Sequence, residues 1–305
     1  MAKETKASDR GCGGSPAPQL SDEQVREVVR DLLSRVEKLE AQVAAIRAAG
    51  QPSLRRVAAR EAWEGEPPLF DSKEVVPPTP TDDPDYIVGG APTGMFPDCC
   101  AVGNSSGFFC SGTLIAKDVV VTAKHCQQVD RVFLKGRDVS FSSRGEVIPV
   151  KKQVCHPTED LRLLILEHAS SVSPRRIVRG DELGTPQEVT LAGFGTIDFS
   201  GTQGFGLKRK VTVPIIILDP SEEDQTRYGC TASEMVAGHR GLLKDSCSGD
   251  SGGPLYMRGA NGQFLLLGAT SRGTRGTSRV CGEGGVYVRV DKVIDWIWEE
   301  TNADL

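Results

Sequence analysis

The chain has 305 residues, of which 38% are hydrophobic and 25% charged, and its formal net charge is −5 at pH 7. This composition is ordinary for a soluble globular protein, and the slightly acidic balance argues against nucleic acid as a partner. The longest apolar runs, such as Ile215–Leu218, fall far short of the ~20 residues that span a membrane, so we expect no membrane span.

Residues 1–20 are rich in Gly, Ser and Pro and are predicted to be disordered. Residues 21–49 are predicted to form a helix, because apolar residues recur there at alternating spacings of four and three, a heptad pattern. A Ser-x-x-Gln capping box at Ser21 begins this helix, and Gly50 ends it. The heptads favour a parallel homodimer through residues 21–49; the alternative is one amphipathic helix that docks on the rest of the chain.

Residues 50–86 are rich in proline and charged side chains, which predicts an extended linker. Over residues 87–305, short apolar runs alternate with glycine-rich turns. This pattern predicts an all-β fold, a barrel or sandwich, that ends in one helix. The expected strands are Val119–Thr122, Glu188–Ala192, Val211–Leu218, Phe264–Thr270 and Val286–Val290, and the expected helix is Val293–Glu300, with Ile294, Ile297 and Trp298 facing inward.

Nine cysteines are more than a cytosolic protein usually carries, and their density suggests a disulfide-containing secreted protein. Residues 1–14 are polar, however, and lack the apolar stretch of a secretory signal peptide, which indicates the cytoplasm. These two observations conflict and leave the compartment open. There is no Cys-x-x-Cys pair and the four histidines are scattered, so we expect no metal and no cofactor.

The most informative segment is residues 245–254, with the sequence DSCSGDSGGP. A serine between glycines suits a nucleophile, because neighbours without side chains let a scissile carbonyl approach and let backbone amides face the developing oxyanion. We therefore expect Ser251 to be the nucleophile and the amides of Gly249 and Ser251 to be the oxyanion donors. A Gly/Ser turn without function would account for a shorter motif, but not for ten residues of this kind.

A serine hydroxyl needs a base that is oriented by a third group. His125 follows an apolar run and precedes Cys126, which can anchor it. Asp160 precedes the strongly apolar segment Leu161–Leu166, which would bury a carboxylate at its start. His125 and Asp160 are therefore the predicted base and orienting acid. Other candidates for the acid, without this context, are Asp118, Asp130, Asp138 and Asp181.

Residues 87–305 resemble the trypsin/chymotrypsin family of serine proteases. The segments that carry the resemblance occur in the family's order, and they are Ile87–Gly90, Thr122–Cys126, Asp160–Leu164, Gly249–Leu255 and Gly285–Tyr287. The resemblance implies two six-stranded antiparallel β-barrels, with the active site between them and a protein or peptide as substrate. It also implies His125 as general base, Asp160 as its orienting partner and Ser251 as nucleophile.

The resemblance further implies specificity for Arg or Lys. Asp245 matches the family's aspartate at the base of the primary-specificity pocket, where a carboxylate pairs with a substrate cation. Gly273 and Gly285 match the glycines that keep this pocket open, and Ser271 matches a serine that supports the triad aspartate and contacts the substrate backbone. Two family disulfides are also implied, Cys110–Cys126 and Cys247–Cys281.

In this family a new amine, released by cleavage before Ile-Val-Gly-Gly, pairs with the aspartate preceding the nucleophile. Here these groups would be Ile87 and Asp250, so we expect the uncut chain to be latent. Tyr86 precedes the junction in place of the usual Arg or Lys. Activation is therefore expected to need either another protease or a regulator acting through residues 1–86.

Several residues depart from the family pattern. Lys124 and Arg162 add charge close to the triad, and Arg272 replaces a tryptophan beside the pocket, which suggests neighbouring subsites that prefer acidic or polar groups.

There are two alternatives to an active endopeptidase. One is an inactive binding module with the protease fold, and the other is a scaffold whose function resides in the N-terminal helix, with the protease domain as incidental cargo. Four cysteines have no assigned partner, namely Cys99, Cys100, Cys155 and Cys230.

Overall fold

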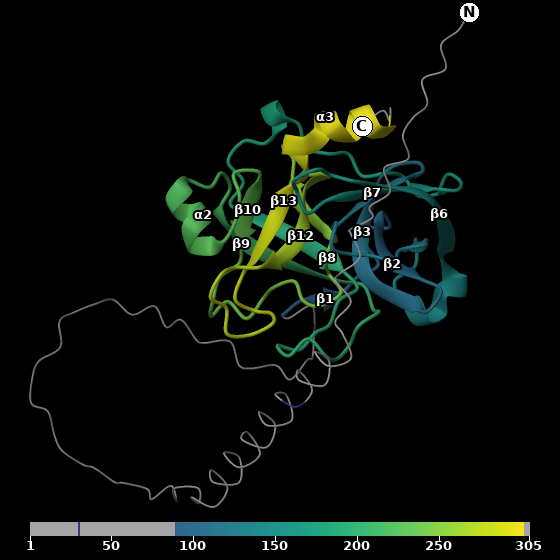
Figure 1. Cartoon of the computed structure of the whole chain (residues 1–305), viewed down its shortest axis with the longest axis horizontal. Helices are drawn as coiled ribbons and strands as arrows, with labels where there is room; N and C mark the ends of the chain where they lie inside the picture. The colour runs from purple at the N-terminus through teal and green to yellow at the C-terminus, as the bar shows by residue number, and fades with distance from the viewer. Residues whose placement is uncertain (1–29, 31–88, 302–305) are drawn as a thin grey trace, which may run out of the picture. The chain divides into compact units, whose positions relative to one another are not determined.

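Figure 1 presents the computed structural model of the chain, in which Arg30 and residues 89–301 are described. Arg30 is helical and exposed. Apart from Arg30, three predicted segments lie outside the described residues: the disordered segment 1–20, the heptad helix 21–49 and the linker 50–86. The Tyr86–Ile87 junction lies outside them too. The predictions made for these segments, including the homodimer, therefore stay predictions.

Six strands form a closed antiparallel barrel in the order β2-β3-β4-β7-β6-β5. They are β2 (Cys99–Asn104), β3 (Gly107–Ala116), β4 (Val119–Thr122), β5 (Arg131–Leu134), β6 (Glu146–Cys155) and β7 (Arg162–Leu166), with the 3-10 helix η1 (Val139–Arg144) between β5 and β6. The side chains of β4 are buried along its whole length, which agrees with its continuous apolar sequence.

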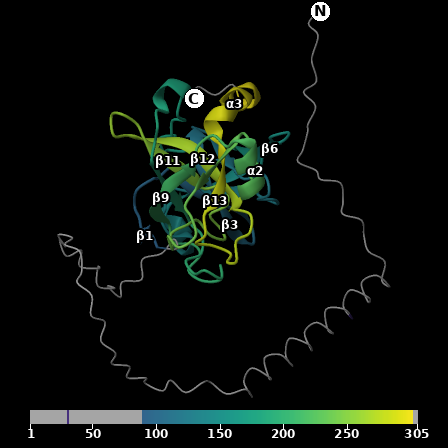
Figure 2. The ribbon, with the colours of Figure 1, turned by 90° about the vertical axis from the view of Figure 1, so that its left-hand side faces the viewer.

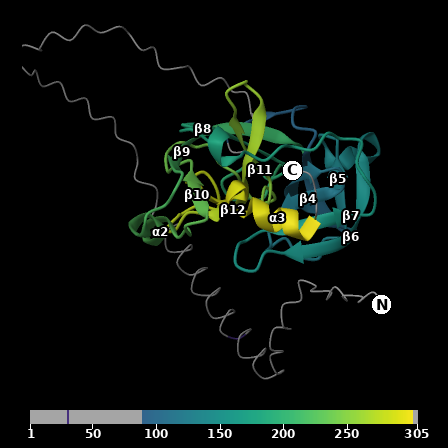
Figure 3. The same ribbon diagram turned by 90° about the horizontal axis from the view of Figure 1, so that it is seen from above.

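A second barrel contains β8 (Glu188–Gly193), β9 (Arg209–Ile217), β10 (Glu234–Ala237), β11 (Pro254–Arg258), β12 (Phe264–Gly273) and β13 (Gly285–Arg289). Pairing of β8 with both β9 and β11 closes it, and the short strand β1 (Ala91–Pro92) pairs with β9. In Figure 3 the labelled strands of the two barrels lie on opposite sides of the molecule. The remaining elements are η2 (Gly180–Glu182), α2 (Glu222–Tyr228), η3 (Val290–Val293) and α3 (Ile294–Thr301).

The predicted two-barrel fold with a C-terminal helix is confirmed, and each of the five expected strands overlaps an observed strand. The helix α3 lies at one end of the barrels in Figures 1 and 2. The prediction that three of its residues face inward was wrong for one of them: Ile297 is fully buried, but Trp298 is 58% exposed. Trp296 is partly buried instead, and its ring meets that of His156 edge-on at 4.7 Å.

One apolar cluster extends across both barrels, and in it rings from the first barrel contact rings from the second. Phe133 of β5 meets Phe194, which follows β8, at 6.3 Å between ring centroids. A buried polar contact adds to this core, because the fully buried carboxylate of Asp98 accepts hydrogen bonds from the Tyr256 hydroxyl at 2.6 Å and from Arg175 at 2.5 Å. The barrels are therefore held firmly together. Among the described residues, no helix combines the length and apolar composition needed to cross a membrane.

Candidate active site

The pairing of β4 with β7 brings the predicted base and acid together. The strands are antiparallel and Thr122 is paired with Arg162, so the residues after β4 meet the residues before β7. His125 Nδ1 lies 2.8 Å from Asp160 Oδ2, and the His125 backbone amide donates to Oδ1 at 3.0 Å. The Cys110–Cys126 disulfide joins the turn after His125 to β3.

Asp160 is held as a carboxylate by its hydrogen bonds. Burial raises its pKa, but the bonds from His125 and from the Ser271 hydroxyl, which donates to Oδ2 at 2.7 Å, outweigh burial and leave the pKa below its usual value. An ionised Asp160 favours a proton on His125 Nδ1, which leaves Nε2 as the acceptor facing a reactant. Two of the alternative acids have other roles, since Asp130 pairs with Arg131 and Asp138 caps η1.

The turn that carries Ser251 is packed directly against the histidine segment. A Cβ at Gly252, whose φ is +75°, would collide with Thr122 and Ala123, so only glycine permits this approach. The Ser251 carbonyl accepts a hydrogen bond of 2.9 Å from the backbone amide of Ser111 on β3. Ser251 and Ser271 line one cavity of about 160 Å³. The structure therefore brings the predicted nucleophile, base and acid to one place.

The predicted oxyanion amide at Gly249 has a fixed orientation. The preceding carbonyl, of Ser248, accepts hydrogen bonds from the Thr196 amide at 2.8 Å and from the Thr196 hydroxyl at 3.2 Å. In a trans peptide the C=O and N–H groups point in opposite directions, so the Gly249 N–H points away from Thr196. Thr196 was not predicted as a site residue, because it lies in a loop without a recognisable motif.

Asp245 lies at the predicted pocket position and is 4% exposed. It lines the same cavity as Ser251, together with Gly273 and Gly285. Its Oδ2 accepts bonds from two backbone amides at 3.0 and 3.1 Å, and its Oδ1 accepts one from the Ser246 amide at 2.8 Å. Burial raises its pKa, and these hydrogen bonds oppose the rise. Within residues 89–301 no ion pair includes this carboxylate, so it remains available to a cation.

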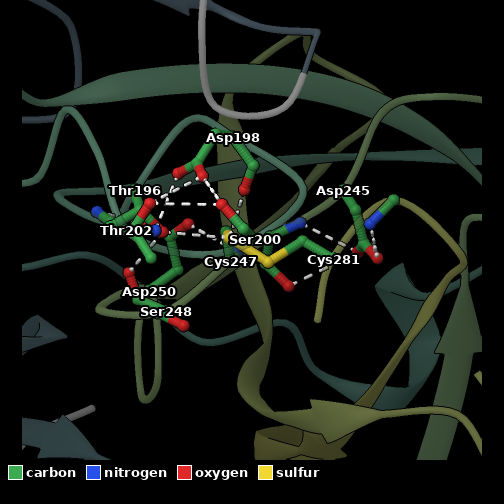
Figure 4. The surroundings of a disulfide bond; sticks show 12 residues. Thr196, Asp198, Ser200, Thr202, Asp245, Cys247, Ser248, Asp250 and Cys281 are labelled. Carbon is green, nitrogen blue, oxygen red and sulfur yellow. Dashed lines mark hydrogen bonds between the residues drawn. A yellow bond between two sulfur atoms is a disulfide. The ribbon is translucent and has the colours of Figure 1, made fainter. Parts of the chain in front are cut away.

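Asp250 is buried and precedes Ser251, the predicted nucleophile. Its carboxylate accepts hydrogen bonds of 2.8 Å from the backbone amides of Gly195 and Cys247. Burial raises its pKa to about 7, against the opposing effect of these bonds. Figure 4 places the Cys247–Cys281 disulfide between Asp250 and Asp245, which lie on opposite sides of it in this view. The predicted partner of Asp250, the amine of Ile87, is outside the described residues.

Both disulfides that the resemblance implies are present, Cys110–Cys126 and Cys247–Cys281. Of the cysteines left without an assignment, Cys155 is disulfide-bonded. The other three are reduced and buried, namely Cys99, Cys100 and Cys230.

The two unexpected charges near the predicted triad have structural partners. Lys124 Nζ donates to the His156 carbonyl at 2.8 Å. Arg162 is buried and donates to the Lys124 carbonyl at 2.8 Å and to the Gln153 side chain at 2.6 Å. Arg162 therefore holds the backbone next to His125, and Lys124 ties that segment to the one before Asp160. Neither cation lines the cavity that contains Ser251.

Comparison with known proteins agrees with this geometry. A family model described as Trypsin matches residues 87–297. The chain is 33% identical over 208 residues to a trypsin of Saccharopolyspora erythraea, covering 64% of this chain and 88% of that protein. It is 31% identical over 214 residues to a trypsin of Phaedon cochleariae, covering 63% and 79% respectively.

A solved structure has the same fold. It is neuropsin, a serine protease expressed in the limbic system of mouse brain, which superposes with a TM-score of 0.57 at 24% identity. The match covers 70% of this chain and 98% of neuropsin. On the match to the family model and the relatives described above, the chain belongs to the trypsin family of serine proteases.

Proposed function

We propose that this protease hydrolyses peptide bonds after Arg or Lys through a triad of His125, Asp160 and Ser251. The observation that carries the proposal is the hydrogen-bonded chain from Ser271 to Asp160 to His125, next to a cavity lined by Ser251 and Asp245. A base oriented by a partly buried carboxylate and a serine in a glycine-rich turn are the groups that acyl transfer needs.

In the proposed reaction the Ser251 hydroxyl oxygen attacks the scissile carbonyl carbon while His125 Nε2 accepts the hydroxyl proton. The amides of Gly249 and Ser251 stabilise the resulting oxyanion. The C–N bond then breaks, and His125 returns the proton to the leaving amine. A water molecule, deprotonated by His125, hydrolyses the acyl-enzyme and restores Ser251.

The proposed specificity rests on Asp245. A substrate guanidinium or ammonium that enters the cavity is desolvated, and an isolated buried charge is unfavourable unless an opposite charge meets it. Asp245 is the buried carboxylate among the residues that line this cavity, and Gly273 and Gly285 leave space for a long side chain. Arg and Lys are therefore the side chains that this site fits best.

We also propose that the uncut chain is latent. Asp250 is buried with two amide donors and forms no ion pair with the described residues. A free amine at Ile87 would supply the missing positive charge and stabilise the turn that carries Gly249 and Ser251.

A serine-directed fluorophosphonate tests the proposed activity. The probe should label the full chain after it has been cut at the Tyr86–Ile87 junction, and the Ser251→Ala variant should not be labelled. Ser248→Ala is a matched control, because it removes a hydroxyl from the same turn and should keep labelling. Labelling of the Ser251→Ala variant, or none of the cut chain, would contradict the proposed nucleophile.

A further inference from the structure

Arg272 lines the same cavity as Ser251 and forms a two-pronged ion pair at its edge. It belongs to β12, and its two terminal nitrogens lie 2.6 and 2.8 Å from the carboxylate oxygens of Glu234 on β10. The Glu234 side chain is 3% exposed, whereas that of Arg272 is 42% exposed. Nη2 also donates to the Gly229 carbonyl at 2.7 Å. The guanidinium is therefore held by Glu234 and is not a free charge that would select acidic substrate residues.

The same guanidinium reaches the triad through one hydroxyl. Arg272 Nη1 lies 2.9 Å from Ser271 Oγ, and Ser271 Oγ lies 2.7 Å from Asp160 Oδ2. A guanidinium can only donate, so the Arg272 contact occupies a lone pair of the Ser271 hydroxyl. The single hydroxyl proton of Ser271 is then directed to the carboxylate of Asp160, which can only accept while it is ionised.

We infer that Arg272 is a positioning residue for the triad: it fixes the Ser271 hydroxyl as a hydrogen-bond donor to Asp160, and Glu234 holds Arg272 in place. This inference rests on the proposed function, because it assigns Asp160 to the triad. The charged and titratable groups around Asp160 are His125, Arg162 and Arg272. Of these, Arg272 is the one that bonds to Ser271.

The inference predicts that Arg272 acts through Ser271, which a double-mutant cycle can test. The full chain is cut at the Tyr86–Ile87 junction, and kcat is measured on a blocked single-residue arginine ester, which does not extend into neighbouring subsites. Glu234→Gln accompanies each Arg272→Met change, so that removal of Arg272 does not leave a buried charge unpaired, and Glu234→Gln alone is measured as a further reference. We expect Arg272→Met to lower kcat by roughly fivefold to twentyfold while Ser271 is present.

In the Ser271→Ala background the same Arg272→Met change should alter kcat by less than about twofold. Arg275→Met is the matched control, because it removes a positive charge from the adjoining loop, where Arg275 bonds to the Thr226 carbonyl. That control should leave kcat unchanged in both backgrounds. Equal losses from Arg272→Met with and without Ser271, or no loss at all, would overturn the inference.

A second readout needs no turnover and separates this inference from the proposed function. The proton on His125 Nδ1, bonded to Asp160, gives a low-field proton resonance that responds to the bonds of that carboxylate. We expect Arg272→Met to shift this resonance clearly when Ser271 is present and much less in the Ser271→Ala background. Equal shifts in both backgrounds would overturn the inference. Absence of turnover together with the expected pattern of shifts would contradict only the proposed activity.

Discussion

The Ser111 hydroxyl donates a 2.9 Å hydrogen bond to the Gly249 carbonyl, and this bond connects β3 of the first barrel to the turn of the second that carries Ser251, the proposed nucleophile. The same hydroxyl accepts a bond of 3.1 Å from the Phe194 amide. Ser111 is fully buried, so water does not replace either bond. Because the Ser248 carbonyl is also held, the peptide groups on both sides of Gly249 are fixed.

Removal of this bond should impair catalysis more than substrate binding. We expect Ser111→Ala to lower kcat by roughly tenfold with little change in KM, since an oxyanion amide acts mainly in the transition state. Steady-state kinetics on the cut chain with an arginine ester would measure both constants. Thr113→Val is the matched control, because it removes another buried hydroxyl of β3, and it should leave kcat unchanged. An equal loss in both variants would contradict this role of Ser111.

The control variant should itself be more stable than the natural chain. Thr113 is fully buried, and its hydroxyl makes no hydrogen bond within the described residues. Burial of an unsatisfied hydroxyl is unfavourable, so Thr113→Val should raise the free energy of unfolding by about 1 kcal/mol. Thr122→Val should lower it, because the Thr122 hydroxyl donates to the Ser111 carbonyl at 2.7 Å. Urea unfolding at equilibrium measures both changes, and destabilisation by Thr113→Val would contradict the argument.

The sequence predicted the architecture, and it indicated candidate reactive residues, because both kinds of signal are local. An apolar run before His125 and another after Asp160 indicated two strands, and the motif around Ser251 indicated a nucleophile turn. Helix α2 was missed, although Ser221 and Asp224 form a capping box at its start. This short helix has no buried residue and hence no apolar periodicity that would reveal it.

The supporting contacts could not be predicted, because they join segments far apart in the sequence. Ser111 and Gly249 are separated by 138 positions, and Arg272 and Glu234 by 38. Nothing in the local sequence of Ser111 indicates a bond to the nucleophile turn. The charge of Arg272 was read as free because its partner lies on β10, a strand that the sequence analysis did not identify.

Specificity should depend on the buried carboxylate of Asp245. We expect Asp245→Ser to lower kcat/KM for Arg and Lys substrates by at least roughly a hundredfold, because the substrate cation would enter the cavity unpaired. Measuring kcat/KM on esters of Arg, Lys and Phe that are otherwise identical compares the three substrate side chains directly. Glu283→Gln is the control and should leave kcat/KM unchanged, because it removes a nearby carboxylate that bonds to Ser278 and Arg240. A natural enzyme that prefers Phe would contradict the proposed specificity.

The buried carboxylate of Asp250 should make the stability of the uncut chain depend on pH. Its pKa is about 7 in the folded chain, compared with 3.8 for an unperturbed aspartate, so the folded chain holds the proton more tightly. Between about pH 4 and pH 7 the unfolded chain loses this proton first, so the free energy of unfolding should fall as pH rises. Asp250→Asn should flatten this dependence. Urea unfolding of both chains across the window measures the difference, and identical slopes would contradict the assignment.

Cleavage at the Tyr86–Ile87 junction should remove this pH dependence of stability and switch on the protease activity. The new amine of Ile87 would pair with Asp250 and lower its pKa, so the fall in stability toward pH 7 should disappear as activity appears.

A pocket built on Asp245 fits Arg or Lys, so the enzyme should cut poorly after Tyr86 and should not activate itself efficiently. We therefore expect the full chain to be nearly inactive until a protease with aromatic preference is added. N-terminal sequencing of active material separates the routes, because Ile87 at the start supports cleavage. Activity of an intact chain only in the presence of a partner would instead indicate regulation through residues 1–86, and full activity of the intact chain alone would refute latency.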